Sequence, residues 1–281
     1  VKSVDRVEKP YKRAARKQRD RTEIEIKPGI VIGARKNIVM IAGPCSVESE
    51  AQLDETAAMV TEQGVSLLRG GAFKPRTGPY SFNGLGEEGL KILRKIADKY
   101  DMAVDTEAMN ETQVDLAAEY ADIIQVGARN MQNYDLLRKL GSIRKPILLK
   151  NGLAATHEEW LLAAEYILAG GNENVILCER GIRTFEQEVR FTLRLGSVPA
   201  LRNLTHLPIM IDPSHAAGTA RWVPDLAGAS VAVGCDGLIV EVHPRPEEAL
   251  SDGPQSLDRE QWTECMENIK RIAAAMGKNV V

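Results

Sequence analysis

The stretch Ile38-Val39-Met40-Ile41-Ala42-Gly43-Pro44-Cys45-Ser46 decides the fold that we predict for this chain of 281 residues. Its first five residues are apolar and largely β-branched, which is typical of a strand buried on both faces. Gly43 and Pro44 end that strand, and a helical pattern begins near Ser49. Cys45 therefore falls between a buried parallel strand and its helix, where α/β proteins bind ligands. Most free cysteines are small buried hydrophobes, so Cys45 alone does not establish a site.

The same succession of an apolar run, a polar or glycine-rich loop and an amphipathic stretch recurs along the chain. Eight strands, each followed by a helix, in about 250 residues describe a (β/α)8 TIM barrel. A doubly wound open sheet is the α/β competitor, but it rarely uses eight such evenly spaced units. The chain also lacks the Walker loop of the nucleotide-binding open sheets. The predicted strands are residues 38–42, 67–73, 103–107, 123–126, 147–150, 175–178, 209–211 and 238–242, and the predicted helices include 87–99, 111–119, 157–169, 186–195 and 259–276.

The chain divides into two predicted regions, a basic N-terminal arm with a β-hairpin at 1–35 and a single barrel at 36–281. The hairpin follows from alternation at 22–26, a Lys-Pro-Gly turn and the apolar run 30–32, and we expect it to cover the bottom of the barrel. Residues 1–21 carry nine Lys or Arg against three Asp or Glu, although the whole chain has a net charge of −3. Because the arm is short and precedes an acidic body, we expect it to contact solvent or another subunit, and we predict no nucleic-acid partner.

Composition places the chain among soluble globular proteins, with 44% hydrophobic and 27% charged residues. No apolar run is long enough to span a bilayer, and the first 20 residues have no apolar signal-peptide centre. The four cysteines form no CxxC pair, which favours a reducing compartment. We therefore expect a cytoplasmic protein with no membrane partner.

Cations follow several of the predicted strands, at the edge where a barrel places its chemistry. A single Lys or Arg would more often be a surface residue beside an acid. Six of them converging on one mouth require an anion, and guanidinium groups suit phosphate and carboxylate. We therefore expect one or two phosphorylated substrates. The cations are Arg69, Lys74, Arg76, Arg129, Lys150 and Arg180.

A second group at the same edge consists of Cys45, His215, Glu241 and Asp252. A thiolate, an imidazole and two carboxylates suit a divalent ion such as Mn, Fe, Co or Zn, and the sulfur disfavours Mg or Ca. Taken singly, the histidine would be a hydrogen-bonded loop residue and the aspartate a turn residue. Only a closed barrel makes the eighth strand a neighbour of the first, so the metal and barrel hypotheses depend on each other.

At these residues the chain resembles the 3-deoxy-D-arabino-heptulosonate 7-phosphate (DAHP) synthases, in particular their type I beta branch. The resemblance extends from about residue 38 to the end of the chain and implies a TIM barrel. The matching stretches are AGPCSVES at 42–49, LRGGAFKPRT at 68–77, QVGARN at 125–130, LKNG at 149–152, CERG at 178–181, DPSHA at 212–216, VEVH at 240–243 and ALSDG at 249–253.

The resemblance implies a metal-dependent, aldol-like condensation of phosphoenolpyruvate with erythrose 4-phosphate, the first step of the shikimate pathway and of aromatic amino-acid synthesis. It implies one divalent metal ion and a homotetramer. The implied metal ligands are Cys45, His215, Glu241 and Asp252; the phosphoenolpyruvate contacts are Arg69, Lys74, Ala128, Arg129, Lys150 and Arg180; the erythrose 4-phosphate contacts are Lys74, Pro75, Arg76, Thr77 and Asp252; the catalytic residues are Lys74, Glu107, Cys45 and His215.

Two alternatives remain at this point. The sister synthase makes 3-deoxy-D-manno-octulosonate 8-phosphate from arabinose 5-phosphate, but it carries Lys-Ala-Asn-Arg-Ser where this chain has Lys-Pro-Arg-Thr. A phosphosugar-binding barrel without catalysis would need the cations but not the metal ligands.

The chain departs from the family pattern at two positions, Gly78 and Asn83, where the resemblance predicts Ser and Gln. Only some 35 residues precede the first barrel strand, so we expect no regulatory domain and no feedback inhibition by Tyr, Phe or chorismate-pathway products.

Overall fold

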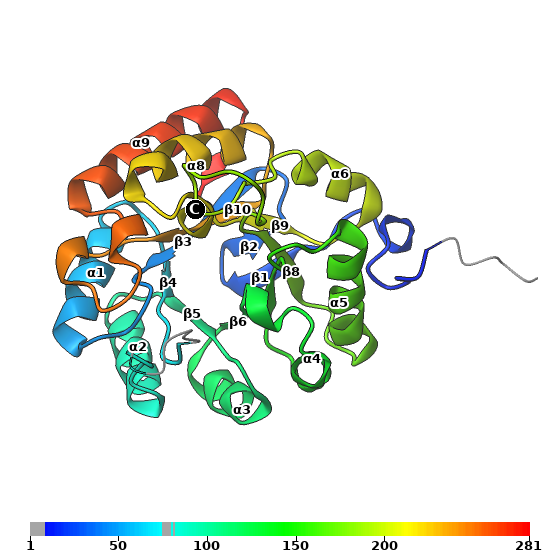
Figure 1. The fold of residues 1–281 in the computed structure, drawn as a ribbon, viewed down its shortest axis with the longest axis horizontal. Coiled ribbons are helices and arrows are strands. Elements are labelled where there is room, and N and C mark those ends of the chain that lie inside the picture. The colour runs from blue at the N-terminus through cyan, green and yellow to red at the C-terminus, as the bar shows by residue number, and fades with distance from the viewer. Residues whose placement is uncertain (1–8, 75–79, 81) are drawn as a thin grey trace, which may run out of the picture.

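A ring of parallel strands surrounded by helices forms the body of the protein (Figure 1), seen in a computed structural model that describes residues 9–74, 80 and 82–281. Within these residues, eight parallel strands pair in the order of the sequence, and β10 pairs with β3 to close the ring. The predicted TIM barrel is therefore confirmed. The barrel strands are β3 (Asn37–Gly43), β4 (Leu67–Arg69), β5 (Ala103–Glu107), β6 (Ile123–Val126), β7 (Ile147–Lys150), β8 (Val175–Glu179), β9 (Ile209–Ile211) and β10 (Gly237–Glu241).

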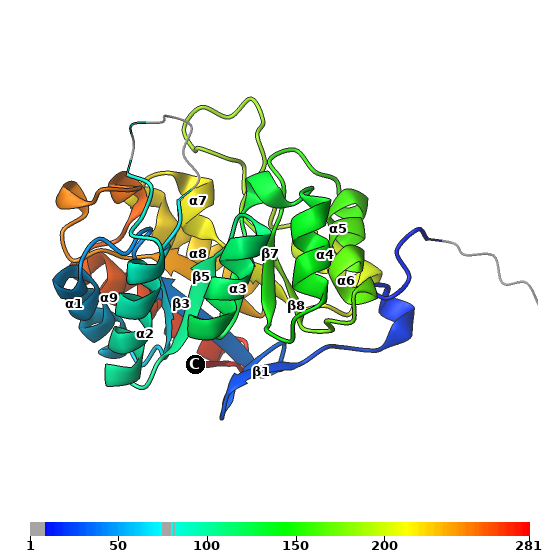
Figure 2. The ribbon, with the colours of Figure 1, turned by 90° about the horizontal axis from the view of Figure 1, so that it is seen from below.

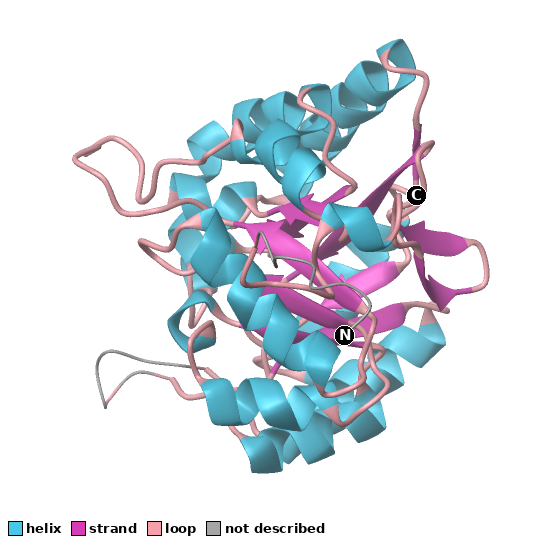
Figure 3. Cartoon of the chain, turned by 90° about the vertical axis from the view of Figure 1, so that its right-hand side faces the viewer, coloured by secondary structure: helices cyan, strands magenta, loops and turns pink. Residues whose placement is uncertain are grey.

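Helices lie on the outside of the ring, as Figures 1 and 3 show from two directions. Helix α5 begins at a reciprocal cap between Thr156 and Glu159, and α9 at one between Asp258 and Gln261, which satisfies their first free N–H groups. The helices are α1 (Glu50–Thr61), α2 (Glu87–Lys99), α3 (Glu111–Tyr120), α4 (Tyr134–Gly141), α5 (His157–Ala169), α6 (Ser197–Leu204), α7 (Pro213–Ala217), α8 (Val223–Ala232) and α9 (Arg259–Ala275).

The strands separate two apolar layers, which explains why the first predicted strand is apolar without interruption. Val39 and Ile41 belong to the layer inside the barrel, whereas Ile38, Met40 and Ala42 belong to the layer between strands and helices. Alternate side chains of a strand point to opposite faces, and here both faces are covered. No helix among the described residues is long and apolar enough to cross a membrane.

The predicted hairpin is confirmed as β1 (Ile24–Lys27) paired antiparallel with β2 (Ile30–Ile32). Ile24 and Ile32 join the apolar layer inside the barrel, so the hairpin covers the amino-terminal end of the ring. Figure 2 shows it at the edge opposite the long loops. The short strand β11 (Asn279–Val280) pairs with the start of β3 at the same end. The opposite, carboxyl end is left for the functional groups.

The described part of the basic arm packs on the barrel rather than extending into solvent. Tyr11, Ala14 and Ala15 are buried, and the backbone N–H groups of Arg13 and Ala14 donate to the carboxylate of Glu165 on α5. Three apolar side chains of this segment are therefore buried against the barrel, while residues 17–20 are exposed to solvent. Contact of the arm with another subunit stays a prediction.

The helix predicted at 186–195 is absent from the structure, so that prediction is wrong. Residues 182–192 form a loop closed by an antiparallel bridge between Ile182 and Thr192, and the next helix, α6, begins at Ser197. The N–H groups of Arg190 and Phe191 donate to carbonyls of α7 instead of to a helix of their own. Tertiary contacts have overridden a local helical preference. The strand predicted at 67–73 also ends earlier, at Arg69.

Candidate active site and metal centre

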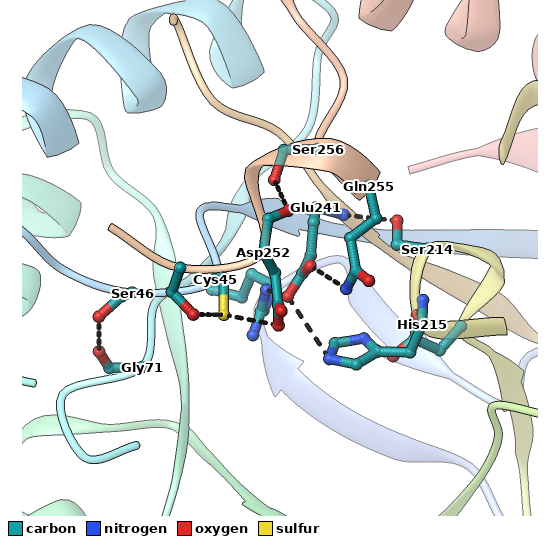
Figure 4. A network of polar contacts seen from close by, with 12 residues as sticks. Cys45, Ser46, Gly71, Ser214, His215, Glu241, Asp252, Gln255 and Ser256 are labelled. Carbon is teal, nitrogen blue, oxygen red and sulfur yellow. Dashed lines mark hydrogen bonds and ion pairs between the residues drawn. The ribbon is translucent and has the colours of Figure 1, made fainter. Parts of the chain in front are cut away.

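Three candidate metal ligands meet at the carboxyl end of the barrel, with the donor atoms of Cys45, Glu241 and Asp252 all within 4.8 Å of one another (Figure 4). Cys45 follows β3, and Glu241 is the last residue of β10, paired in register with Gly43. Gly43 has a φ of +153°, and a Cβ there would overlap the carbonyl oxygen of Arg69. The closing pair of strands and this close backbone approach bring the sulfur and one carboxylate together.

The loop after β10 supplies the second carboxylate. Asp252, in this loop, has a left-handed backbone with φ of 52°. Its Oδ2 lies 3.2 Å from Cys45 Sγ, and Ser251 Oγ lies 3.0 Å from the same sulfur. The thiol is therefore held between two oxygen groups of one loop.

His215, on the short helix α7, lies beside Glu241 but is not one of the three residues whose donor atoms all lie within 4.8 Å of one another. Asp212 caps this helix by accepting the His215 N–H at 2.9 Å. The imidazole Nδ1 lies 2.8 Å from Asp212 Oδ2, and Nε2 lies 3.6 Å from Glu241 Oε1. A carboxylate behind one ring nitrogen is the usual way of directing the other toward a metal.

The charge state of the cluster fits a site that exchanges a proton for a cation. Burial raises the pKa of the Cys45 thiol to about 11, with Lys74 opposing that shift. Although burial favours the neutral acid, His215 and Arg69 lower the pKa of Glu241 to about 2. Binding of a divalent ion would displace the thiol proton. One sulfur, one imidazole nitrogen and two carboxylates fit the transition metals predicted from the sequence.

Two further polar side chains hold Glu241 in place. Gln255 Nε2 donates to Glu241 Oε2 at 2.6 Å, and Ser214 Oγ accepts the Glu241 N–H at 2.9 Å. Arg69 pairs with the remaining carboxylate oxygen, Oε1, at 2.5 Å. The carboxylate is thus fixed in orientation before any ligand binds.

Four of the predicted cations are buried at the same end of the barrel: Arg69, Lys74, Lys150 and Arg180. Lys150 pairs with Asp212 at 2.8 Å, and Lys74 donates to the carbonyl of Cys45 at 2.8 Å. The Arg180 guanidinium lies 4.0 Å from the centre of the Phe191 ring, and its buried Nη1 has no hydrogen-bond partner among the described residues. An unsatisfied buried donor of this kind is suited to an anionic ligand. Arg69, the fourth, pairs with Glu241 as described above.

The other predicted site residues are less enclosed or lie outside the described residues. Ala128 and Arg129 are on the short 3₁₀ turn η2 (Ala128–Asn130) that follows β6, and Glu107 is the half-buried last residue of β5. The structure does not describe three of the predicted erythrose 4-phosphate contacts, Pro75, Arg76 and Thr77.

Several buried polar groups near the site received no role from the sequence. Asp212 lies between Lys150 and His215, and Gln255 contacts Glu241. Asp105 is fully buried on β5 and accepts a hydrogen bond from Gln125. The sequence could have indicated a role for Asp105, because a carboxylate in a strand that is buried on both faces is costly unless it has polar partners.

Asp105 predicts a pH dependence of stability. Burial raises its pKa to about 7, against the opposing charges of Arg69 and Lys150. Between about pH 4 and 7 the folded state therefore binds a proton that the unfolded chain releases, so this group's contribution to the free energy of unfolding falls as pH rises through that window. We expect Asp105→Asn to gain stability relative to wild type from pH 4 to pH 8, measured by urea unfolding of the metal-free protein. A constant difference between the two proteins would contradict this.

The fold and the site define an enzyme barrel whose strand ends gather cations beside a cluster of metal-ligating groups. Residues 18–276 match the model of the DAHP synthetase I family, and the chain belongs to this family. It is 54% identical, over its whole length and 82% of the relative, to a phospho-2-dehydro-3-deoxyheptonate aldolase of Thermotoga maritima.

Solved structures agree with this assignment. The crystal structure of the Thermotoga maritima DAHP synthase superposes with a TM-score of 0.95 over 100% of this chain and 82% of that one, at 54% identity. A truncated form of the 3-deoxy-D-arabino-heptulosonate 7-phosphate synthase from the same organism gives a TM-score of 0.89, over 95% of this chain and 98% of that one, at 50% identity.

Relatives of the sister class are less similar. A 2-dehydro-3-deoxyphosphooctonate aldolase of Stenotrophomonas maltophilia is 32% identical over 89% of this chain and 96% of the relative. The chain is therefore an enzyme of the DAHP synthase family, and the arabinose 5-phosphate alternative is not favoured.

Proposed function

We propose that the protein condenses phosphoenolpyruvate with erythrose 4-phosphate and water to give DAHP and inorganic phosphate, as the first step of the shikimate pathway. Carbon three of phosphoenolpyruvate bonds to the aldehyde carbon, water adds at carbon two, and carbon–oxygen cleavage releases phosphate. The observation that carries this proposal is the position of buried cations beside a cluster of one sulfur and two carboxylates, with the His215 imidazole next to it, at one end of the barrel.

Cys45, His215, Glu241 and Asp252 would hold the divalent ion. A bound ion of this kind supplies Lewis-acid polarisation of a carbonyl oxygen. The protein's own contribution is a fixed set of donors, because Gln255 and Ser214 orient Glu241 and Asp212 stands behind His215.

Arg129, Lys150 and Arg180 bind the phosphate and carboxylate of phosphoenolpyruvate in this proposal, together with Arg69, Lys74 and Ala128. Buried cations interact strongly with anions because little water screens them. Arg76 and Thr77 bind the far phosphate of erythrose 4-phosphate, with Pro75 beside them, and so fix the distance between the reacting carbons.

Lys74 holds the proton that neutralises the new alkoxide. Its ammonium group is buried and donates to the carbonyl of Cys45, which places it next to the candidate metal ligands. Glu107 lies at the end of β5 on the same face and holds the water that adds at carbon two.

The assembly and the cellular site belong to the same proposal. We propose a catalytic barrel at 36–281, an N-terminal arm and hairpin at 1–35, a homotetramer and a cytoplasmic location. All four cysteines are buried as free thiols, which fits a reducing compartment.

A paired substrate assay tests the proposed reaction. Purified enzyme with phosphoenolpyruvate is given erythrose 4-phosphate or arabinose 5-phosphate, with and without a chelator, and phosphate release is measured. We expect release with erythrose 4-phosphate, loss of release on chelation, and recovery when Mn²⁺ or Co²⁺ is restored. Faster release with arabinose 5-phosphate would identify the sister reaction. Binding of both substrates without release would identify a non-catalytic barrel.

A further inference from the structure

Arg190 and Phe191 lie in the loop between β8 and α6. Phe191 contacts the candidate substrate-binding residue Arg180, and Arg190 contacts Gln255, which holds the candidate metal ligand Glu241. Figure 2 shows this loop above the carboxyl end of the barrel. We propose that Phe191 is a positioning residue for the substrate-binding cation Arg180, and that Arg190 is a positioning residue for the metal ligands through Gln255. This inference rests on the proposed function and adds residues to which that function assigned no role.

Phe191 supports the guanidinium of Arg180 from one side. The ring centre lies 4.0 Å from Arg180 Cζ, and both side chains are buried. A guanidinium stacked on an aromatic face keeps its plane while its N–H groups remain available at the edge. Nη1, which lacks a partner among the described residues, is thereby held ready for a phosphate or carboxylate oxygen.

Arg190 reaches the metal side of the same site. Its Nη1 donates to Gln255 Oε1 at 3.1 Å, and Gln255 Nε2 donates to Glu241 Oε2 at 2.6 Å. The same Nη1 lies 3.9 Å from Asp252 Oδ1. Because the amide of Gln255 has one donor end and one acceptor end, Arg190 fixes which end faces Glu241. Arg190 therefore influences the positions of two candidate metal ligands, Glu241 through Gln255 and Asp252 directly.

The backbone of this pair is tied to the element that carries His215. The N–H groups of Arg190 and Phe191 donate to Ala217 and Ala216 of α7 at 3.0 and 2.9 Å. Gly218, at a φ of +72°, ends α7, and a Cβ there would overlap the Cβ of Arg190. Neighbouring residues on one fixed backbone thus contact a substrate cation and the metal-ligand network, so we expect metal binding and phosphoenolpyruvate binding to influence each other.

Two variants separate the two positioning roles without requiring turnover. Co²⁺ affinity of the metal-free protein is measured by chelator competition and by the thiolate absorption band, and phosphoenolpyruvate affinity by calorimetry without erythrose 4-phosphate. Arg190→Met is expected to weaken Co²⁺ binding by about tenfold, as loss of such outer contacts typically does. Phe191→Leu is expected to weaken phosphoenolpyruvate binding by about tenfold while Co²⁺ affinity stays within about twofold.

Matched controls come from the same loop. Phe185 is 91% exposed, and Arg183 is also exposed. Phe185→Leu and Arg183→Met are expected to match wild type in both affinities. The double variant Arg190→Met with Gln255→Met is expected to bind Co²⁺ about as well as the weaker single variant, because the two side chains act in series.

The outcomes distinguish this inference from the proposed function. If wild type binds Co²⁺ and phosphoenolpyruvate but Arg190→Met and Phe191→Leu match it, the positioning roles are wrong and the proposed function stands. If wild type binds neither ligand, both are wrong. Should Arg190→Met fail to fold, Gln255→Met takes its place, and an unchanged Co²⁺ affinity in that variant overturns the role of Arg190.

Discussion

Cys45→Ala removes metal-dependent turnover, with an expected fall in kcat/KM of about a thousandfold or more, since several kcal/mol of Lewis-acid stabilisation are lost and each 1.4 kcal/mol is tenfold in rate. The sulfur lies within 4.8 Å of both carboxylate donors, and it is the softest donor of the set. The measurement is phosphate release across a Mn²⁺ or Co²⁺ titration, together with the thiolate absorption band of bound Co²⁺, which we expect to disappear.

Cys265→Ala is the matched control for this variant. Cys265 is also a buried free thiol, but it lies on α9 and belongs to the apolar layer between strands and helices. Both variants lose one buried sulfur, so both carry a similar packing cost. We expect only the Cys45 variant to lose metal and activity. A Cys45→Ala enzyme with wild-type Co²⁺ affinity would show that the sulfur is not a ligand.

The barrel could be predicted because the properties that decide it are local. Residues 38–42 are apolar on both alternating faces, and the structure buries Ile41 inside the ring and Met40 outside it. Eight such units in succession are typical of a closed barrel, and in the structure β10 pairs with β3. The proximity of Cys45 to Glu241 is a consequence of that closure, which is why the sequence could predict it from strand ends alone.

The support of the site could not be predicted in the same way, because it depends on contacts between distant segments. Gln255 orients Glu241 across 14 residues, and Arg190 reaches Gln255 across 65. The stretch that contains Arg190 has a helical pattern, but its N–H groups find acceptors on α7. Periodicity records which side chains are apolar and leaves open which neighbour will accept a backbone hydrogen bond.

Lys150→Met is expected to lower both kcat/KM and the free energy of unfolding. Lys150 is buried at the end of β7 and pairs with Asp212 at 2.8 Å. Although burial favours the neutral acid, His215 and Lys150 hold the pKa of Asp212 well below its ordinary value. Removal of the ammonium leaves a buried carboxylate with one partner fewer, and such changes cost about 3 kcal/mol of unfolding free energy. Because we propose that this ammonium group binds phosphoenolpyruvate, its loss should lower kcat/KM for that substrate by about a hundredfold or more.

The double variant Lys150→Met with Asp212→Asn separates these two effects. Neutralising both partners removes the unpaired buried charge, so we expect most of the lost stability to return in urea unfolding. The affinity for phosphoenolpyruvate should not return, because the cation is still missing. If the double variant recovers binding and turnover together with stability, Lys150 acts only by neutralising Asp212. If it recovers stability alone, the ammonium group contacts the substrate, and the ion pair with Asp212 holds that ammonium charged and in place before phosphoenolpyruvate arrives.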